Sequence, residues 1–341
     1  MKNISQYFGY DFTKRESRIA SYDYIENFIA DQHVDWSTPP NTAFIVNNFI
    51  QAISEFSDLE FAFLIVHSGY IPESYEADSS AETLYSKLIE TVVLDWAKRI
   101  GYKNSKLPTQ KASMEDVSLL DDRHVIVCDA KSFRLGRSQS APNVKDVLKH
   151  ADIEKWLSAY SEDKYKRLGG LVTFPSQHDW KQGSDYYQYT TDKSSPTLSL
   201  YYEHLAYILI SGMTSENLIL LYDSYAKIYP EKKGKKENNR AYYYSQLHKA
   251  LYNDSEEDWA RFDITAQKVI SEKVYHSAHR LDSDLCSIRE NIENKYRAEK
   301  DIEVLRTKAI QAEYEKATDD FHKQKDRIHR FRTVAKGYHE D

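Results

Sequence analysis

The last third of this 341-residue chain contains no residue that breaks a helix. All eight prolines lie at or before Pro230, and no glycine occurs between Gly234 and Gly337. Residues 235–336 are therefore 102 consecutive positions without the two residue types that most often interrupt helices. Apolar residues at three- and four-residue spacing in this segment include Leu281, Leu285, Ile288 and Ile292. This spacing places them on one helix face and predicts long amphipathic helices.

The N-terminal part of the chain is also predicted to be mostly helical. The apolar run Phe61–Val66 lies inside an expected helix within the first 75 residues. A second helix begins after Ser79, which has the spacing of a capping box with Glu82, and Gly101 is placed to end it. Its apolar face is formed by Leu84, Leu88, Val92, Trp96 and Ile100.

The pattern changes after Pro108 to short runs of β-branched and apolar residues. We predict strands over residues 116–120, 124–128, 169–174 and 197–200. Asp121–Arg123 forms the turn between the first two strands, and helices are expected near 151–160 and 201–210. This succession predicts an α/β fold with a mixed four- to five-stranded sheet flanked by helices.

The composition excludes several classes of protein. No apolar run approaches the roughly 20 residues that span a membrane, and the first residues, MKNISQYFGYDF, lack the apolar region of a signal peptide. Two cysteines, Cys128 and Cys286, are too few for a disulfide framework or a multi-cysteine zinc site. We therefore expect a soluble, cytoplasmic protein without a membrane partner.

Charge is unevenly distributed along the chain. The formal net charge is −7, and residues 1–122 contain 10 Lys/Arg against 19 Asp/Glu. Residues 131–149, called the basic strip below, contain five cations and one anion. A local basic strip on an acidic body favours a groove for a polyanion over a general nucleic-acid coat.

The pattern with the most chemical information is formed by Asp116, Asp129 and Lys131. The side chains of Asp129 and Lys131, two positions apart in an extended segment, point to the same face. Asp116 begins the preceding strand, and it lies beside Asp129 if the two strands pair through their turn. Two carboxylates can hold a hard divalent ion such as Mg²⁺, while a lysine orients water or stabilises developing charge. This set suits metal-assisted hydrolysis of a phosphodiester.

The same spacing also arises by chance, and a strand that ends in a solvent-exposed Asp and Lys is the simpler alternative. Two features favour a site. Asp129 directly follows the apolar run Val125–Cys128, and charges at the rim of a buried sheet rarely lack a partner. The basic strip comes next and can neutralise a phosphate backbone.

The segment Val127–Arg137 (VCDAKSFRLGR) resembles the catalytic segment of the HindIII family of type II restriction endonucleases, in the PD-(D/E)xK nuclease superfamily. Four further segments resemble the family in the same order: Ser68–Glu73, Glu82–Lys87, Asn143–Asp146 and Tyr202–Ala206. Several ordered blocks are more specific than one D-A-K motif.

The resemblance implies a restriction-endonuclease-like core and Mg²⁺-dependent cleavage of both strands of a palindromic site in double-stranded DNA by a homodimer. By position, Asp116 and Asp129 are the metal carboxylates, the backbone carbonyl of Ala130 is a third ligand, and Lys131 is the catalytic lysine. The resemblance also implies a cognate DNA methyltransferase that acts on the same site.

Three residues fall where the family reads bases in the major groove: Asn143, Lys145 and Asp146. Their chemistry suits that task, because Asn pairs with adenine, Lys with guanine acceptors and Asp with the cytosine amino group. The preceding stretch, Ser138–Pro142, looks longer than its counterpart in the family, which leaves the register of the base contacts open.

Four residues have two interpretations each. Glu82 is either the helical glutamate that related nucleases place near the metal or only a capping residue. Glu115 replaces the motif's usual proline, and it either binds a second ion or faces solvent. Arg134 and Arg137 are expected to contact phosphates because they lie in the basic strip, the alternative being solvated surface.

We expect a helical N-terminal part (1–64), a nuclease core (65–225) and a helical C-terminal part (226–341) that serves as the dimer scaffold. The leading interpretation is a type II restriction endonuclease. The alternatives are a non-specific or repair DNA nuclease on the same core, and a catalytically silent DNA-binding protein. The intact set of Asp116, Asp129 and Lys131 argues against the silent protein.

Overall fold

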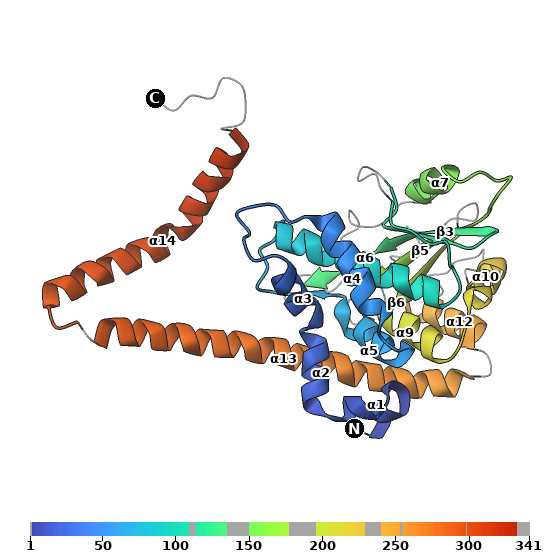
Figure 1. Ribbon diagram of the computed structural model, residues 1–341, viewed down its shortest axis with the longest axis horizontal. Coiled ribbons are helices and arrows are strands. Elements are labelled where there is room, and N and C mark those ends of the chain that lie inside the picture. Colours follow the sequence, from blue (N-terminus) through green and yellow to red (C-terminus); the bar gives the residue numbers. More distant parts are fainter. Residues whose placement is uncertain are drawn as a thin grey trace. The chain divides into compact units, whose positions relative to one another are not determined.

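The computed structural model has a mixed α/β architecture in which helices flank a four-stranded sheet, as predicted (Figure 1). It describes residues 2–108, 114–134, 150–176, 196–228, 240–252, 255–297 and 299–332. By internal packing the chain divides into two compact units, 1–277 and 278–341. None of the helices in these described ranges is long and apolar enough to cross a membrane.

The main sheet is mixed, with the strand order β2-β3-β5-β6. Its strands are β2 (Val117–Leu120), β3 (His124–Ala130), β5 (Lys166–Phe174) and β6 (Thr197–Tyr201). β2 runs antiparallel to β3, whereas β3, β5 and β6 are parallel to one another. The predicted turn is confirmed, since the Asp121 carboxylate accepts the backbone N–H of Arg123 (2.7 Å) and of His124 (2.6 Å). Two short strands, β1 (Tyr70–Ile71) and β4 (Phe133–Arg134), form a separate parallel pair.

Residues 2–108 form six α-helices and one 3-10 helix before the main sheet. They are α1 (Lys2–Phe8), η1 (Tyr10–Thr13), α2 (Arg15–Tyr22), α3 (Tyr24–Gln32), α4 (Thr42–Ser54), α5 (Asp58–Ser68) and α6 (Ser80–Arg99). The predicted run Phe61–Val66 lies in α5 and is fully buried. Ser79 caps α6 by accepting the N–H of Glu82 (3.2 Å), and Gly101 follows the helix with a φ of 120°. Both predicted ends of α6 are thus confirmed.

The other helices of the described residues are α7 (His150–Ser158), α9 (Tyr202–Ile210), α10 (Ser215–Asp223), α11 (Tyr225–Ile228), α12 (Arg240–Tyr252), α13 (Glu256–Arg297) and α14 (Ile302–Arg332). In Figure 1, α7 lies on one side of the sheet, and α5 and α9 lie on the other. The last three helices confirm the long helices predicted for the segment without glycine or proline. The first turns of α13 belong to the core of the first unit, because Trp259, Phe262, Val269 and Ile270 are buried.

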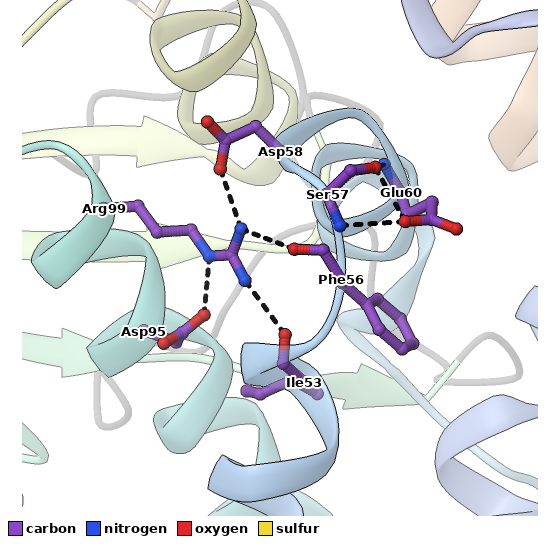
Figure 2. Close-up of polar contacts among 7 residues, drawn as sticks. All are labelled: Ile53, Phe56, Ser57, Asp58, Glu60, Asp95 and Arg99. Carbon is purple, nitrogen blue, oxygen red and sulfur yellow. Dashed lines mark hydrogen bonds and ion pairs between the residues drawn. The ribbon is translucent and has the colours of Figure 1, made fainter.

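One arginine attaches the C-terminal end of α6 to the corner between α4 and α5 (Figure 2). Arg99 donates to the backbone carbonyls of Phe56 and Ile53, both at 2.9 Å. It also donates to the carboxylates of Asp58 and Asp95, both at 2.7 Å. This position of α6 matters for the site, because α6 packs against β2 and β3.

Candidate active site

The two predicted metal carboxylates lie together at one end of the β2–β3 hairpin. Asp116 directly precedes β2, and its N–H donates to the carbonyl of Cys128 (2.9 Å). Asp116 Oδ2 accepts the backbone N–H of Ala130 (2.9 Å), and the Asp129 carboxylate lies near enough for its charge to raise the pKa of Asp116. The register that pairs Val117 with Cys128 therefore brings Asp116 beside Asp129, as the sequence predicts.

Lys131 completes the predicted trio. Its Nζ lies 2.8 Å from Asp129 Oδ2, so the two side chains share one side of the chain as expected. Asp129 is only 6% exposed. A buried carboxylate at the rim of the sheet thus has a cationic partner, which is the condition under which such burial is tolerated.

A third carboxylate, that of Glu90 on α6, was missed by the sequence reasoning. Burial raises the pKa of Glu90, an effect that the neighbouring Lys87 ammonium opposes and the charge of Asp129 reinforces. Lys87 and Glu90 form an ion pair one turn apart on the helix. The signal was available, because Glu90 is the one charged residue in the apolar run Leu88–Leu94.

The electrostatics of the site favour a cation. Burial raises the pKa of Asp116, and the negative charges of Asp129 and Glu90 raise it further. Like charges in a poorly hydrated place hold one carboxyl in its protonated form until an opposite charge replaces the proton. Strongly shifted acids are also typical of functional sites.

The carboxylates of the site are few for a metal ion that needs a complete protein cage. Within the described ranges, no three or more His, Cys, Asp or Glu side chains are grouped so that they hold a metal ion by themselves. Mg²⁺ does not require such a cage, since it is usually bound by one or two carboxylates and keeps several waters. Asp116 and Asp129 provide two hard oxygen ligands of this kind, so the residues fit a magnesium ion.

Glu82 and Arg134 contact each other. Glu82 accepts from Arg134 Nε (3.2 Å) and from the backbone N–H of Asp78 (2.6 Å). Arg134 also donates to the carbonyl of Pro72 (3.4 Å). Glu82 precedes Glu90 by eight residues, roughly 12 Å along a helix axis. The contacts found for Glu82 therefore tie the start of α6 to β4, whereas Glu90 is the α6 carboxylate that interacts with the aspartates.

Glu115 does not face solvent, since it is 3% exposed. Its Oε1 accepts the hydroxyls of Ser118 (2.8 Å) and Tyr160 (2.6 Å). Tyr160 follows α7, so this carboxylate links β2 to the end of that helix. The solvent-facing alternative was wrong because Tyr160, distant in sequence, covers the residue.

Four predicted DNA-contacting residues lie outside the described residues: Asn143, Lys145, Asp146 and Arg137. The stretch Ser138–Pro142 also lies outside them.

Comparison with known proteins gives two results. The model of the family "HindIII restriction endonuclease" matches residues 60–318. The chain is also 30% identical over 202 residues to the type II restriction enzyme HindIII of Haemophilus influenzae, and the aligned part covers 56% of this chain and 59% of that enzyme. The family match covers well over half of the chain and includes the hairpin with both aspartates. The protein therefore belongs to the HindIII restriction endonuclease family.

Proposed function

We propose that this protein is a magnesium-dependent type II restriction endonuclease that cuts both strands of DNA at a short palindromic site. The observation that carries the proposal is the meeting of Asp116, Asp129 and Lys131 at one end of a hairpin. These are the positions at which the family resemblance expects metal ligands and a catalytic lysine. The related protein from Haemophilus influenzae is named as a type II restriction enzyme, which supports the same activity here.

Each part of the site has a distinct task in this proposal. Mg²⁺ held by Asp116, Asp129 and the carbonyl of Ala130 would polarise a phosphoryl oxygen and help to form hydroxide. Lys131, kept close to Asp129, orients the attacking water or stabilises the negative charge that develops on the phosphate. The carboxylates repel a phosphate backbone, and the basic strip offsets this repulsion.

A supercoiled-plasmid assay with and without Mg²⁺ tests the activity. Asp129→Asn and Lys131→Ala should each abolish cleavage, while both variants still bind the cognate site in Ca²⁺, which fits carboxylates but orders them too loosely for the reaction. Asp122→Asn is the matched control, because Asp122 is an exposed residue of the hairpin turn.

The product pattern separates the proposal from its alternatives. Discrete fragments indicate restriction, a smear indicates a non-specific or repair nuclease, and an unchanged plasmid indicates a DNA-binding protein without activity. Near wild-type cleavage by Asp129→Asn or Lys131→Ala would contradict the assignment of the site.

We propose that Asn143, Lys145 and Asp146 read bases and that Arg134 and Arg137 contact phosphates. Arg134 must then exchange its partner Glu82 for a phosphate oxygen.

The host genome needs protection from such an enzyme, so a cognate methyltransferase with the same recognition site is the expected partner in the cytoplasm. Sequencing the ends of a cut plasmid would identify the site.

We further propose a homodimer that is held together by the second unit. Four apolar residues of α13 in this unit are exposed: Leu281 (45%), Leu285 (64%), Ile288 (56%) and Ile292 (51%). Their 4-3-4 spacing is that of a coiled-coil seam. In a parallel pair, Asp284 of one copy faces Arg289 of the other, which is a favourable pairing of opposite charges. A two-fold axis also matches the symmetry of a palindrome.

The dimer is tested in the full-length chain. Leu285→Lys combined with Ile288→Lys should give a monomer by light scattering and should convert plasmid linearisation into nicking. Glu290→Lys adds the same charge on the opposite helix face and should leave the dimer intact. A doubly substituted protein that remains dimeric and linearises plasmid would place the interface elsewhere.

A further inference from the structure

The backbone of Lys131 is held from two sides at the point where the chain leaves the sheet. β3 ends at Ala130, and the Lys131 N–H donates to the carbonyl of Thr173 on β5 (3.0 Å). The carbonyl of Lys131 accepts the hydroxyl of Tyr202, the first residue of α9, at 2.9 Å. Both peptide groups that flank the Lys131 Cα are therefore fixed, one by β5 and one by α9.

The ring of Tyr202 fits a space that a glycine leaves open. Tyr202 is 1% exposed. A Cβ added to Gly69 would lie 2.5 Å from Tyr202 Cε2 and 2.8 Å from Pro175 Cβ, which is closer than real contacts allow. Gly69 also accepts the N–H of Phe133 (3.0 Å), two residues after Lys131. One glycine thus borders both the tyrosine ring and the chain that follows the lysine.

The Tyr202 hydroxyl acts as a donor. Burial raises the pKa of Tyr202 well above its ordinary value, so the hydroxyl keeps its proton at neutral pH. A buried O–H needs an acceptor, and the Lys131 carbonyl, which lies beyond the end of β3, needs a donor. The hydrogen bond from the Tyr202 hydroxyl to the Lys131 carbonyl therefore satisfies both groups.

We propose that Tyr202 is a positioning residue for Lys131. Its hydroxyl fixes the backbone of Lys131 directly after β3, and so fixes the direction of the lysine side chain and holds the ammonium beside Asp129. This inference rests on the proposed nuclease function, because it assigns to Tyr202 a role in the reaction through the catalytic lysine. Tyr202 itself touches neither the aspartates nor DNA in this role.

The test compares two variants that each lose one buried hydroxyl. Tyr202→Phe removes the bond to Lys131 and keeps the ring. Tyr222→Phe is the matched control, since the Tyr222 hydroxyl is also buried and donates to a backbone carbonyl, that of Gly170 on β5 (2.6 Å). The readouts are the single-turnover cleavage rate constant, the Kd for cognate DNA in Ca²⁺ and the melting temperature.

We expect the two variants to lose similar thermal stability and to bind DNA as wild type does. Cleavage by Tyr202→Phe should fall roughly ten- to a hundredfold, as is typical when a catalytic group is displaced by about 1 Å. Cleavage by Tyr222→Phe should not change. If wild type cleaves and Tyr202→Phe cleaves equally fast, or loses DNA affinity in proportion to its rate, the inference is overturned. An inactive wild type would instead refute the proposed function.

Gly69→Ala provides a second, independent arm. The added methyl group displaces the Tyr202 ring, so cleavage should fall without any change in the hydrogen-bonding groups. The same substitution in the Tyr202→Phe background should have little further effect on cleavage, because no hydroxyl remains to be displaced. A full additional loss in that background would also overturn the inference.

Discussion

Replacement of Arg99 by methionine should destabilise the first unit more than any other exchange of a single cation on α6. The Arg99 side chain is 15% exposed, and its guanidinium donates to four acceptors, two of them backbone carbonyls (Figure 2). It also lies 4.4 Å from the centroid of the Phe61 ring. Methionine fills a similar volume but donates no hydrogen bond, so all four acceptors lose this donor at once.

The loss of unfolding free energy in Arg99→Met depends on which of the four acceptors are buried. Asp95 is 14% exposed and Asp58 is 60% exposed, so the lost pair with Asp95 dominates and the pair with Asp58 contributes little. Removing one partner of a buried ion pair costs about 3–5 kcal/mol. The Ile53 carbonyl keeps the backbone N–H of Phe56 as a donor (3.1 Å), so the lost bond to the Phe56 carbonyl matters more and adds about 1 kcal/mol when water reaches this carbonyl only in part. We expect a loss of roughly 5 kcal/mol, or a fall in Tm of roughly 10 °C or more.

Thermal unfolding followed by circular dichroism measures the effect. Arg99→Lys should lie between wild type and Arg99→Met, because an ammonium keeps the charge but cannot reach four acceptors in fixed directions. Lys98→Met is the matched control, since Lys98 is exposed in the same helical turn. The reasoning is refuted if Arg99→Met melts within about 2 °C of Lys98→Met, which corresponds to less than about 1 kcal/mol.

Three further predictions concern pH, base reading and the metal site. Burial raises the pKa of Glu203 from 4.5 to about 8, so between these pH values only the folded state keeps this proton, and the free energy of unfolding falls as pH rises. Urea unfolding at several pH values should show that this group lowers the free energy of unfolding by on the order of 1.4 kcal/mol per pH unit, and Glu203→Gln should lack this contribution. Lys145→Ala should lower the ratio of cognate to random DNA binding by about 1–3 kcal/mol in fluorescence anisotropy, and an unchanged ratio would show that Lys145 reads no base. Glu90→Gln should change the Mg²⁺ concentration that gives half-maximal cleavage, whereas Glu82→Gln should not. The opposite result would show that Glu82, and not Glu90, is the helical glutamate near the metal.

The hairpin of the site was predictable from sequence because its determinants are local. A β-branched run, a turn rich in Asp and the two-residue period of a strand were enough to bring Asp116 beside Asp129. The long helices were equally predictable, because the absence of glycine and proline from residues 235–336 can be read directly from the sequence and requires no knowledge of tertiary contacts. In these cases the pattern and the tertiary structure require the same arrangement.

The parts that sequence did not reveal depend on partners distant in the chain. Glu115 became buried because Tyr160, 45 positions away, covers it. Glu90 joined the aspartates because α6 packs against β2 and β3, and a helical period shows which residues share a face but not which strand they meet. The bond from Tyr202 to Lys131 spans 71 positions and has no local signature.

The local character of the hairpin also affects when the site becomes complete during synthesis. Both aspartates and the lysine lie within residues 116–131, and contacts that are close in sequence form first as a chain emerges from the ribosome. A two-stranded hairpin alone is barely stable in water, and its carboxylates remain hydrated. Thr173 and Tyr202, which fix the lysine backbone, are translated later. A nascent chain therefore contains the proposed reactive groups without their final placement, and we expect the proposed nuclease activity to begin only after most of the core has been made.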